Sequence, residues 1–129
     1  MIDGIVLDTT ALIDFASGKS LYIRARVRAA IADFSTVVVP AAALSAAWRD
    51  APDHAHPALE RVPTLENVFY VDELDEVIAR QAGRLCAGSE LGVDEIHAAW
   101  SASWRQWPLL TTTGERYARI PRLHIEQLP

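Results

Sequence analysis

Residues 5–10, Ile-Val-Leu-Asp-Thr-Thr, decide the fold that this sequence predicts. The first three form the short apolar run that is typical of a strand buried in a parallel sheet. Asp8 ends the run, and a helical pattern follows from Thr10 to Ala16. At the carboxyl end of the first strand of an open α/β sheet, a carboxylate faces the crevice in which such sheets bind ligands. The alternative interpretation is that Asp8 only caps the helix that follows it.

The composition favours one α/β domain spanning residues 1–129. The chain has 129 residues, half of them hydrophobic, which is enough for a proper core. No apolar run approaches the roughly 20 residues that a membrane span needs, and no signal peptide is recognisable. Its one cysteine, Cys86, cannot form an internal disulfide, so we expect a cytoplasmic protein.

The net charge of −5 argues against binding nucleic acid by bulk electrostatics, although an acidic metal pocket would itself contribute negative charge.

Strand and helix patterns alternate along the rest of the chain. This order predicts a three-layer α/β/α sandwich around one mostly parallel sheet of four to five strands. We expect further strands at residues 36–39, 68–71, 109–112 and 123–128, and helices at residues 21–34, 41–49, 72–88, 94–106 and 114–118. Asp72 is expected to cap the helix at 72–88. Residues 50–57, with two prolines and two histidines, are expected to form a loop.

Two surface features have both a plain and a functional interpretation. Arg24, Arg26 and Arg28 lie off the apolar stripe of their helix, where they are either simply solvated or placed to contact RNA phosphates or an acidic partner. Trp100, Trp104 and Trp107 share one helical face, which predicts a core or interface stripe; exposed rings would instead offer a stacking platform for bases.

Two classes of α/β protein whose first strand ends in aspartate are excluded by their residues. Phospho-acceptor receivers need further acids before the end of that strand and a lysine after a late strand. Dehalogenase-type phosphatases need a second aspartate two residues after the first, where this chain has Thr10, and also a late lysine. The one lysine, Lys19, comes too early for either class.

Four blocks of sequence, in order, carry a resemblance to a third class. They are Leu7-Asp8-Thr9-Thr10-Ala11-Leu12-Ile13-Asp14, then Val37-Val38-Val39-Pro40 with a helix carrying Trp48-Arg49, then Asp94-Glu95-Ile96-His97-Ala98-Ala99, and finally residues 109–117, Leu-Leu-Thr-Thr-Thr-Gly-Glu-Arg-Tyr. Across essentially the whole chain these blocks resemble the PIN-domain family, and in style the toxin halves of VapBC-type toxin–antitoxin pairs.

The resemblance implies a cluster of acids that binds Mg²⁺ or Mn²⁺ for the hydrolysis of an RNA phosphodiester. Carboxylate oxygens suit such hard cations, which stabilise charge on the phosphate and activate water. Asp8 matches the first acid of the family and Asp94 the third. Ala46 stands where the second is expected and Thr113 where the fourth is expected, so two of the four acids are missing.

The missing acids leave two hypotheses open. The first is a metal-dependent endoribonuclease of toxin type with weak or lost activity, in which Asp8 and Asp94 hold one ion weakly at most, Glu115 substitutes for a missing acid, and Thr10 supports Asp8. The second is a catalytically inactive PIN-fold module that binds protein or RNA. The resemblance also implies a homodimer, and an antitoxin-like partner that inserts an arginine among the carboxylates.

Overall fold

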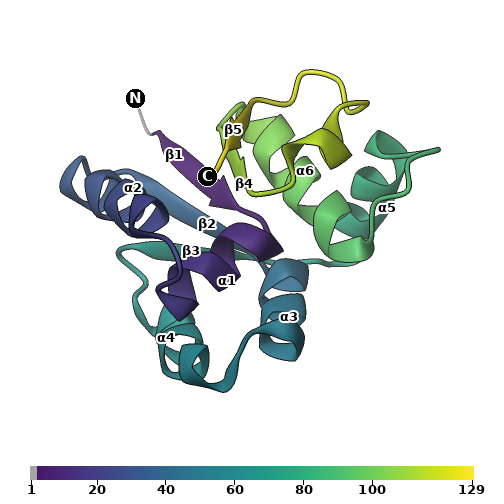
Figure 1. The fold of residues 1–129 in the computed structure, drawn as a ribbon. Coiled ribbons are helices and arrows are strands. Elements are labelled where there is room, and N and C mark those ends of the chain that lie inside the picture. Colours follow the sequence, from purple (N-terminus) through teal and green to yellow (C-terminus); the bar gives the residue numbers. More distant parts are fainter. Residues whose placement is uncertain (1–2) are drawn as a thin grey trace.

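The computed structural model describes residues 3–129, which form a five-stranded, entirely parallel sheet (Figure 1). The strands are β1 (Gly4–Leu7), β2 (Thr36–Pro40), β3 (Phe69–Asp72), β4 (Leu109–Thr111) and β5 (Ile125–Gln127), and their spatial order is β3-β2-β1-β4-β5. The chain therefore builds outward from β1 in one direction, then returns to the other side of β1 with β4. The predicted α/β class and PIN-like architecture are confirmed.

Six α-helices connect and flank these strands. They are α1 (Thr9–Ser17), α2 (Leu21–Ala32), α3 (Ala41–Asp50), α4 (His56–Arg61), α5 (Glu76–Leu85) and α6 (Val93–Arg105). Short 3₁₀ turns lie at η1 (Asp53–Ala55), η2 (Val62–Thr64) and η3 (Gly114–Tyr117). Gly18 ends α1 with a left-handed φ of 73°, a conformation that glycine adopts without steric cost. No helix among residues 3–129 is long and apolar enough to cross a membrane.

Successive side chains of the central strands point to opposite faces of the sheet, and each face is covered by its own hydrophobic core. Ile5, Leu7, Val37 and Val39 face a core built with α1, α2 and α4. Val6 and Val38 face the opposite core, built with α6 and η3. Figure 1 shows the two helical layers on either side of the sheet, with α3 at the end where β1 and β2 finish. Strands covered on both faces must be apolar at every position, which explains their continuous hydrophobic runs.

Two local expectations were wrong. Residues 50–57 are not one loop, because η1 and the start of α4 lie there and bury Ala55. The tryptophan stripe is not the buried face of α6, which is formed by His97, Ala98, Ala99, Ser101 and Ala102, so of the core and interface interpretations of the stripe only the interface stays a prediction for Trp104. Small residues let α6 approach both the sheet and α3 closely, while Trp104 stays 58% exposed.

Asp72 does not cap a helix either. It is the last residue of β3, and the N-cap of α5 is Asp75. The buried Asp72 carboxylate accepts hydrogen bonds from Ser101 Oγ at 2.6 Å and from Arg105 Nη1 at 2.8 Å. The Arg105 guanidinium in turn lies 4.4 Å from the centre of the Trp104 ring. This network joins the edge strand to α6.

Candidate active-site crevice

The strand order places a ligand crevice between β1 and β4. The chain turns in opposite directions from these two neighbouring strands, and ligands of open α/β sheets bind at such a switch point, beyond the carboxyl ends of the strands. Asp8 follows β1 directly, and Thr112 and Thr113 follow β4. Asp94 enters the same region at the second residue of α6.

Asp8 is a helix cap and a crevice residue at once. It is the N-cap of α1, and its Oδ1 accepts hydrogen bonds from Ala11 N at 3.0 Å and from Thr10 Oγ1 at 2.7 Å. Its Oδ2 accepts one from the Tyr117 hydroxyl at 2.9 Å. Only 2% of the residue is exposed. Burial raises the pKa of Asp8, and the hydrogen bonds that favour its ionised form offset this only in part.

Asp94 is bound to the same helix end through the neighbouring threonine. Thr9 Oγ1 donates to Asp94 Oδ2 at 2.6 Å, while Thr10 Oγ1 donates to Asp8. The two carboxylates therefore lie at the amino terminus of α1, and Asp94 also lies in the first turn of α6. Positive ends of two helices converge there, which favours negative charge in the crevice. The structure thus brings together two aspartates that are 86 residues apart in the sequence.

Tyr117 is a crevice residue that the sequence did not single out. Its ring is 1% exposed and packs in the core beneath η3, with its hydroxyl directed at Asp8. Burial, followed by the negative charge of Asp8, raises the pKa of Tyr117, so the hydroxyl keeps its proton and donates. A buried tyrosine hydroxyl needs a partner, and here the partner is the first acid of the site. A tyrosine at the end of the polar segment formed by residues 111–116 carries no sequence signal for this contact.

The other two positions at which the resemblance implies acids lie on α3 and in the segment that follows β4. Ala46 is buried on α3, whose Ala42 N donates to His97 Nδ1 on α6. Thr113 N donates to Thr111 Oγ1, and the Thr10 hydroxyl accepts a hydrogen bond from Thr112 N at 2.9 Å. Hydroxyl and methyl groups thus occupy the crevice where the family resemblance implies acids.

The two remaining acids near the crevice are directed elsewhere. Glu95 accepts from Gly92 N at 2.9 Å and pairs with Arg116. Burial acts to raise the pKa of Glu95, but these donors outweigh it and lower the pKa. The exposed Glu115 lines a separate hollow together with Arg119 and residues 88–91. Across residues 3–129, no three His, Cys, Asp or Glu side chains are grouped to hold a metal ion, so Glu115 does not complete a three-acid site with Asp8 and Asp94.

These residues do not fit a metal centre with several carboxylate ligands. A carboxylate offers about four acceptor positions, and Asp8 uses three of them for internal hydrogen bonds. Asp94 uses one. The oxygens that remain free belong to two residues only, which limits the crevice to one ion with a shell made mostly of water.

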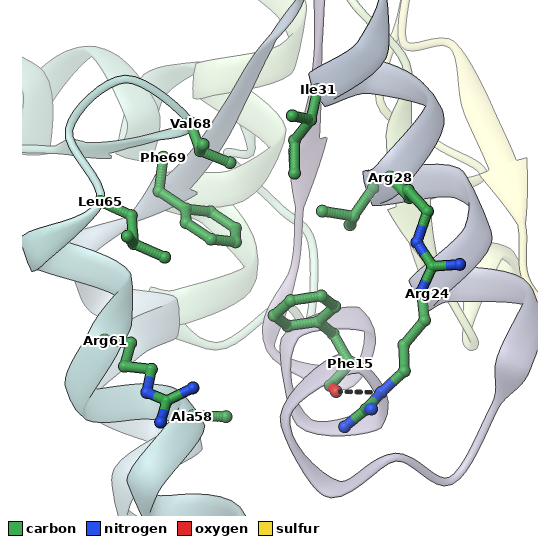
Figure 2. A pocket seen from close by; sticks show the side chains of 10 residues that line it. Phe15, Arg24, Arg28, Ile31, Ala58, Arg61, Leu65, Val68 and Phe69 are labelled. Carbon is green, nitrogen blue, oxygen red and sulfur yellow. Dashed lines mark hydrogen bonds between the residues drawn. The ribbon is translucent and has the colours of Figure 1, made fainter.

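A second concave surface lies on the opposite helical layer, between α2 and α4. Phe15 and Phe69 line this pocket (Figure 2), which has a volume of about 340 Å³. Their ring centres are 5.7 Å apart in an edge-to-face arrangement. Arg24, Arg28 and Arg61 also line it. None of these arginines forms an ion pair with a carboxylate of residues 3–129. The result is an apolar groove with uncompensated positive charge.

Comparisons with known proteins agree with this fold. No protein-family model matches the sequence, and no curated protein matches it. Among solved structures, the chain superposes on VapBC2 from Rickettsia felis bound to a promoter DNA fragment with a TM-score of 0.74, at 15% identity and over 100% of both chains. For DNA-bound VapBC from Salmonella typhimurium the TM-score is 0.73, at 22% identity and 98% coverage of each chain.

A further similar structure is VapC20 from Mycobacterium tuberculosis, described as a sarcin-ricin loop cleaving toxin. The TM-score is 0.67 at 13% identity, and the match covers 89% of this chain and 94% of that one. These likenesses show that the chain has the PIN-like fold of VapC-type toxin structures. The predicted resemblance is confirmed at the level of the fold.

Proposed function

We propose that this chain is a PIN-type, nuclease-like protein related in function to VapC toxins, in which metal-dependent RNA hydrolysis is weak or lost. One observation carries the proposal. Among residues 3–129 no three His, Cys, Asp or Glu side chains are grouped to hold a metal ion, and of the two aspartates at the β1–β4 switch point Asp8 has three of its about four acceptor positions occupied by internal donors. The fold of a toxin nuclease is present, and its acidic centre is reduced.

Asp8 and Asp94 are the residues that would hold an ion, with Thr10 supporting Asp8. A bound Mg²⁺ or Mn²⁺ would stabilise charge on an RNA phosphodiester and lower the pKa of a bound water. Two carboxylates bind such an ion weakly, because three internal donors already occupy acceptor positions on Asp8 and water must supply most of the ion's shell.

Calorimetric titration with Mn²⁺ and Mg²⁺, together with an RNA cleavage assay, tests this function. We expect metal dissociation constants in roughly the millimolar range or no heat at all, and cleavage that is slow and lost in D8N and D94N. Binding in the micromolar range with rapid cleavage would refute the statement that the centre is reduced. Cleavage that persists in D8N would place the activity at another site or in a contaminant.

The second part of the proposal is an antitoxin-like protein partner. The groove between α2 and α4 presents three arginines without ion-pair partners around an apolar floor, in a chain whose net charge is −5. Its complement is an amphipathic segment with apolar side chains for Phe15 and Phe69 and acidic residues for the rim. An arginine farther along the same partner would pair with Asp8 and Asp94 in the crevice. The resemblance also leads us to propose a homodimer and an RNA substrate.

Charge reversal separates the two partner contacts. With the product of the neighbouring gene as the probe, R28E/R61E should weaken binding at low salt through the groove, and D94R should weaken it through the crevice. R119E, an exposed arginine lining a different hollow, is the matched control. If binding by R28E/R61E equals that by R119E, the groove is not the docking surface; if D94R has no effect, no partner arginine enters the crevice. Sedimentation of the chain alone tests the homodimer.

A further inference from the structure

The crevice contains a group that competes with a cation, and this group is the Tyr117 hydroxyl. Among the donors to Asp8, the backbone N–H of Ala11 is the cap bond of α1 and Thr10 lies two residues from Asp8 along the same chain segment. Tyr117 comes from a distant segment, 109 residues away, and donates to Oδ2. Oδ1 already accepts two hydrogen bonds, so Oδ2 is the Asp8 oxygen on which a cation would have to bind.

We propose that the Tyr117 hydroxyl occupies the position on Asp8 Oδ2 that a divalent cation requires, and that it keeps the crevice free of metal. This inference rests on the proposed function and adds a residue to it. Tyr117 acts as a positioning residue: its proton satisfies the carboxylate and holds η3 against the end of β1. Weak metal binding then has two separate causes, the absence of acids at positions 46 and 113 and the hydroxyl at position 117.

The packing of Tyr117 makes this role testable with a small change. The ring lies among Val6, Leu109 and Ile120 in the core beneath η3, so it is retained in Y117F. Only the hydroxyl is removed, which frees Oδ2 toward the crevice where Asp94 also lies. A hydrogen bond to a carboxylate is stronger than one between neutral groups. Removing the Tyr117 hydroxyl should therefore change the affinity of Asp8 Oδ2 for a cation by a measurable amount.

A conservative control is available on the same chain. Tyr22 also directs its hydroxyl at a carboxylate, Glu126 Oε2 at 3.4 Å, but Tyr22 is 47% exposed and Glu126 lies within β5. Y22F therefore removes a tyrosine–carboxylate contact without touching Asp8. Both variants replace a tyrosine by a phenylalanine and so remove the same hydroxyl group.

Manganese binding by wild type, Y117F and Y22F decides the proposal. Calorimetry with Mn²⁺ alone should show that Y117F binds about tenfold more tightly than wild type, a change equivalent to about 1.4 kcal/mol, while Y22F matches wild type. Equal affinities in all three proteins, or no binding by any of them, would show that the hydroxyl is not what excludes the ion. Equal strengthening in Y22F would also overturn the proposal, because that variant leaves Asp8 unchanged.

A measurement on the unaltered protein guards against a folding defect in Y117F. The chain has three tyrosines, so their Cζ carbons give three NMR signals after selective ¹³C labelling. Any Mn²⁺ or Mg²⁺ that enters the wild-type crevice must displace the hydroxyl, and the Tyr117 signal must move in parallel with binding. Heat of binding without such movement refutes the inference. Rapid cleavage by wild type would refute the proposed function instead, so the two failures are distinguishable.

Discussion

Restoring the two missing acids should turn the crevice into a metal-dependent centre. The change is A46E/T113D, which places one carboxylate on α3 and one two residues after the end of β4, where we expect them to face Asp8 and Asp94. Without metal, each added charge about 5 Å from another carboxylate costs about 3 kcal/mol at an effective dielectric constant of about 20, so the two together cost about 6 kcal/mol. For a chain of this size that corresponds to a fall in Tm of roughly 20 °C.

Metal should reverse part of this loss. An ion at about 100 times its dissociation constant stabilises the folded protein by about 2.7 kcal/mol, which recovers a little under half of the cost. We therefore expect the Tm of A46E/T113D to be lowest in EDTA and roughly 10 °C higher in millimolar Mn²⁺. Cleavage of RNA in Mn²⁺ should exceed that of wild type by at least about tenfold, because the restored carboxylates hold the ion in place.

Thermal denaturation monitored by circular dichroism, in EDTA and in Mn²⁺, measures the first effect, and a gel assay with labelled RNA measures the second. The control is A46Q/T113N, which adds side chains of the same shape without charge. A folded A46E/T113D variant with the same Tm in EDTA and Mn²⁺ would refute the reasoning, since positions 46 and 113 would then not face a common ion. Metal-dependent stabilisation of A46Q/T113N would show that volume, not charge, is responsible.

Three further predictions follow from the geometry. Burial raises the pKa of Asp8 above its ordinary value of 3.8, so the folded protein keeps a proton that the unfolded chain has released, and the contribution of Asp8 to stability falls as the pH rises through that interval. D8N should abolish this decline in a series of urea denaturations from pH 4 upward; a decline equal to that of wild type would contradict the assignment. The Arg105 and Asp72 side chains are 10% and 7% exposed, so R105M leaves a buried charge unpaired and should cost about 3–5 kcal/mol in urea denaturation. R49M, at the exposed Arg49, should leave the midpoint unchanged, and equal losses in the two variants would disprove the distinction. Gly83 lies on the exposed face of α5 with open space at its Cβ position, so G83A should stabilise the protein by about 0.5–1 kcal/mol in thermal denaturation, and a lower Tm would argue against a regular helix there.

Local pattern was sufficient for most of the scaffold. The run Val37–Val39 has no polar face, so it predicts a strand covered on both sides, and the structure buries it completely. Asp8 predicts the start of α1 by capping, and Gly18 predicts its end. The resemblance in four ordered blocks predicted the PIN-like fold that the comparisons confirm.

The sequence erred where the partner of a segment decides its role. The tryptophans of α6 have helical spacing, and so do its alanines, so spacing alone does not tell which face is buried. The small residues are the buried ones because α3 and the sheet approach α6 closely on that side. In the sequence, Asp72 and Asp75 both look like helix caps. The contacts with Ser101 and Arg105, which come from a helix about thirty residues later, decide the difference.

The sequence by itself determined the parallel α/β scaffold, the position of Asp8 at the end of the first strand, and the absence of acids at positions 46 and 113. These features depend on local periodicity, capping and residue identity, which can be read along the chain. Only the tertiary structure brought Asp94 and the Tyr117 hydroxyl to the same helix end as Asp8. Contacts across 85 and 109 residues depend on strand order and on the packing of η3, and no local pattern encodes them.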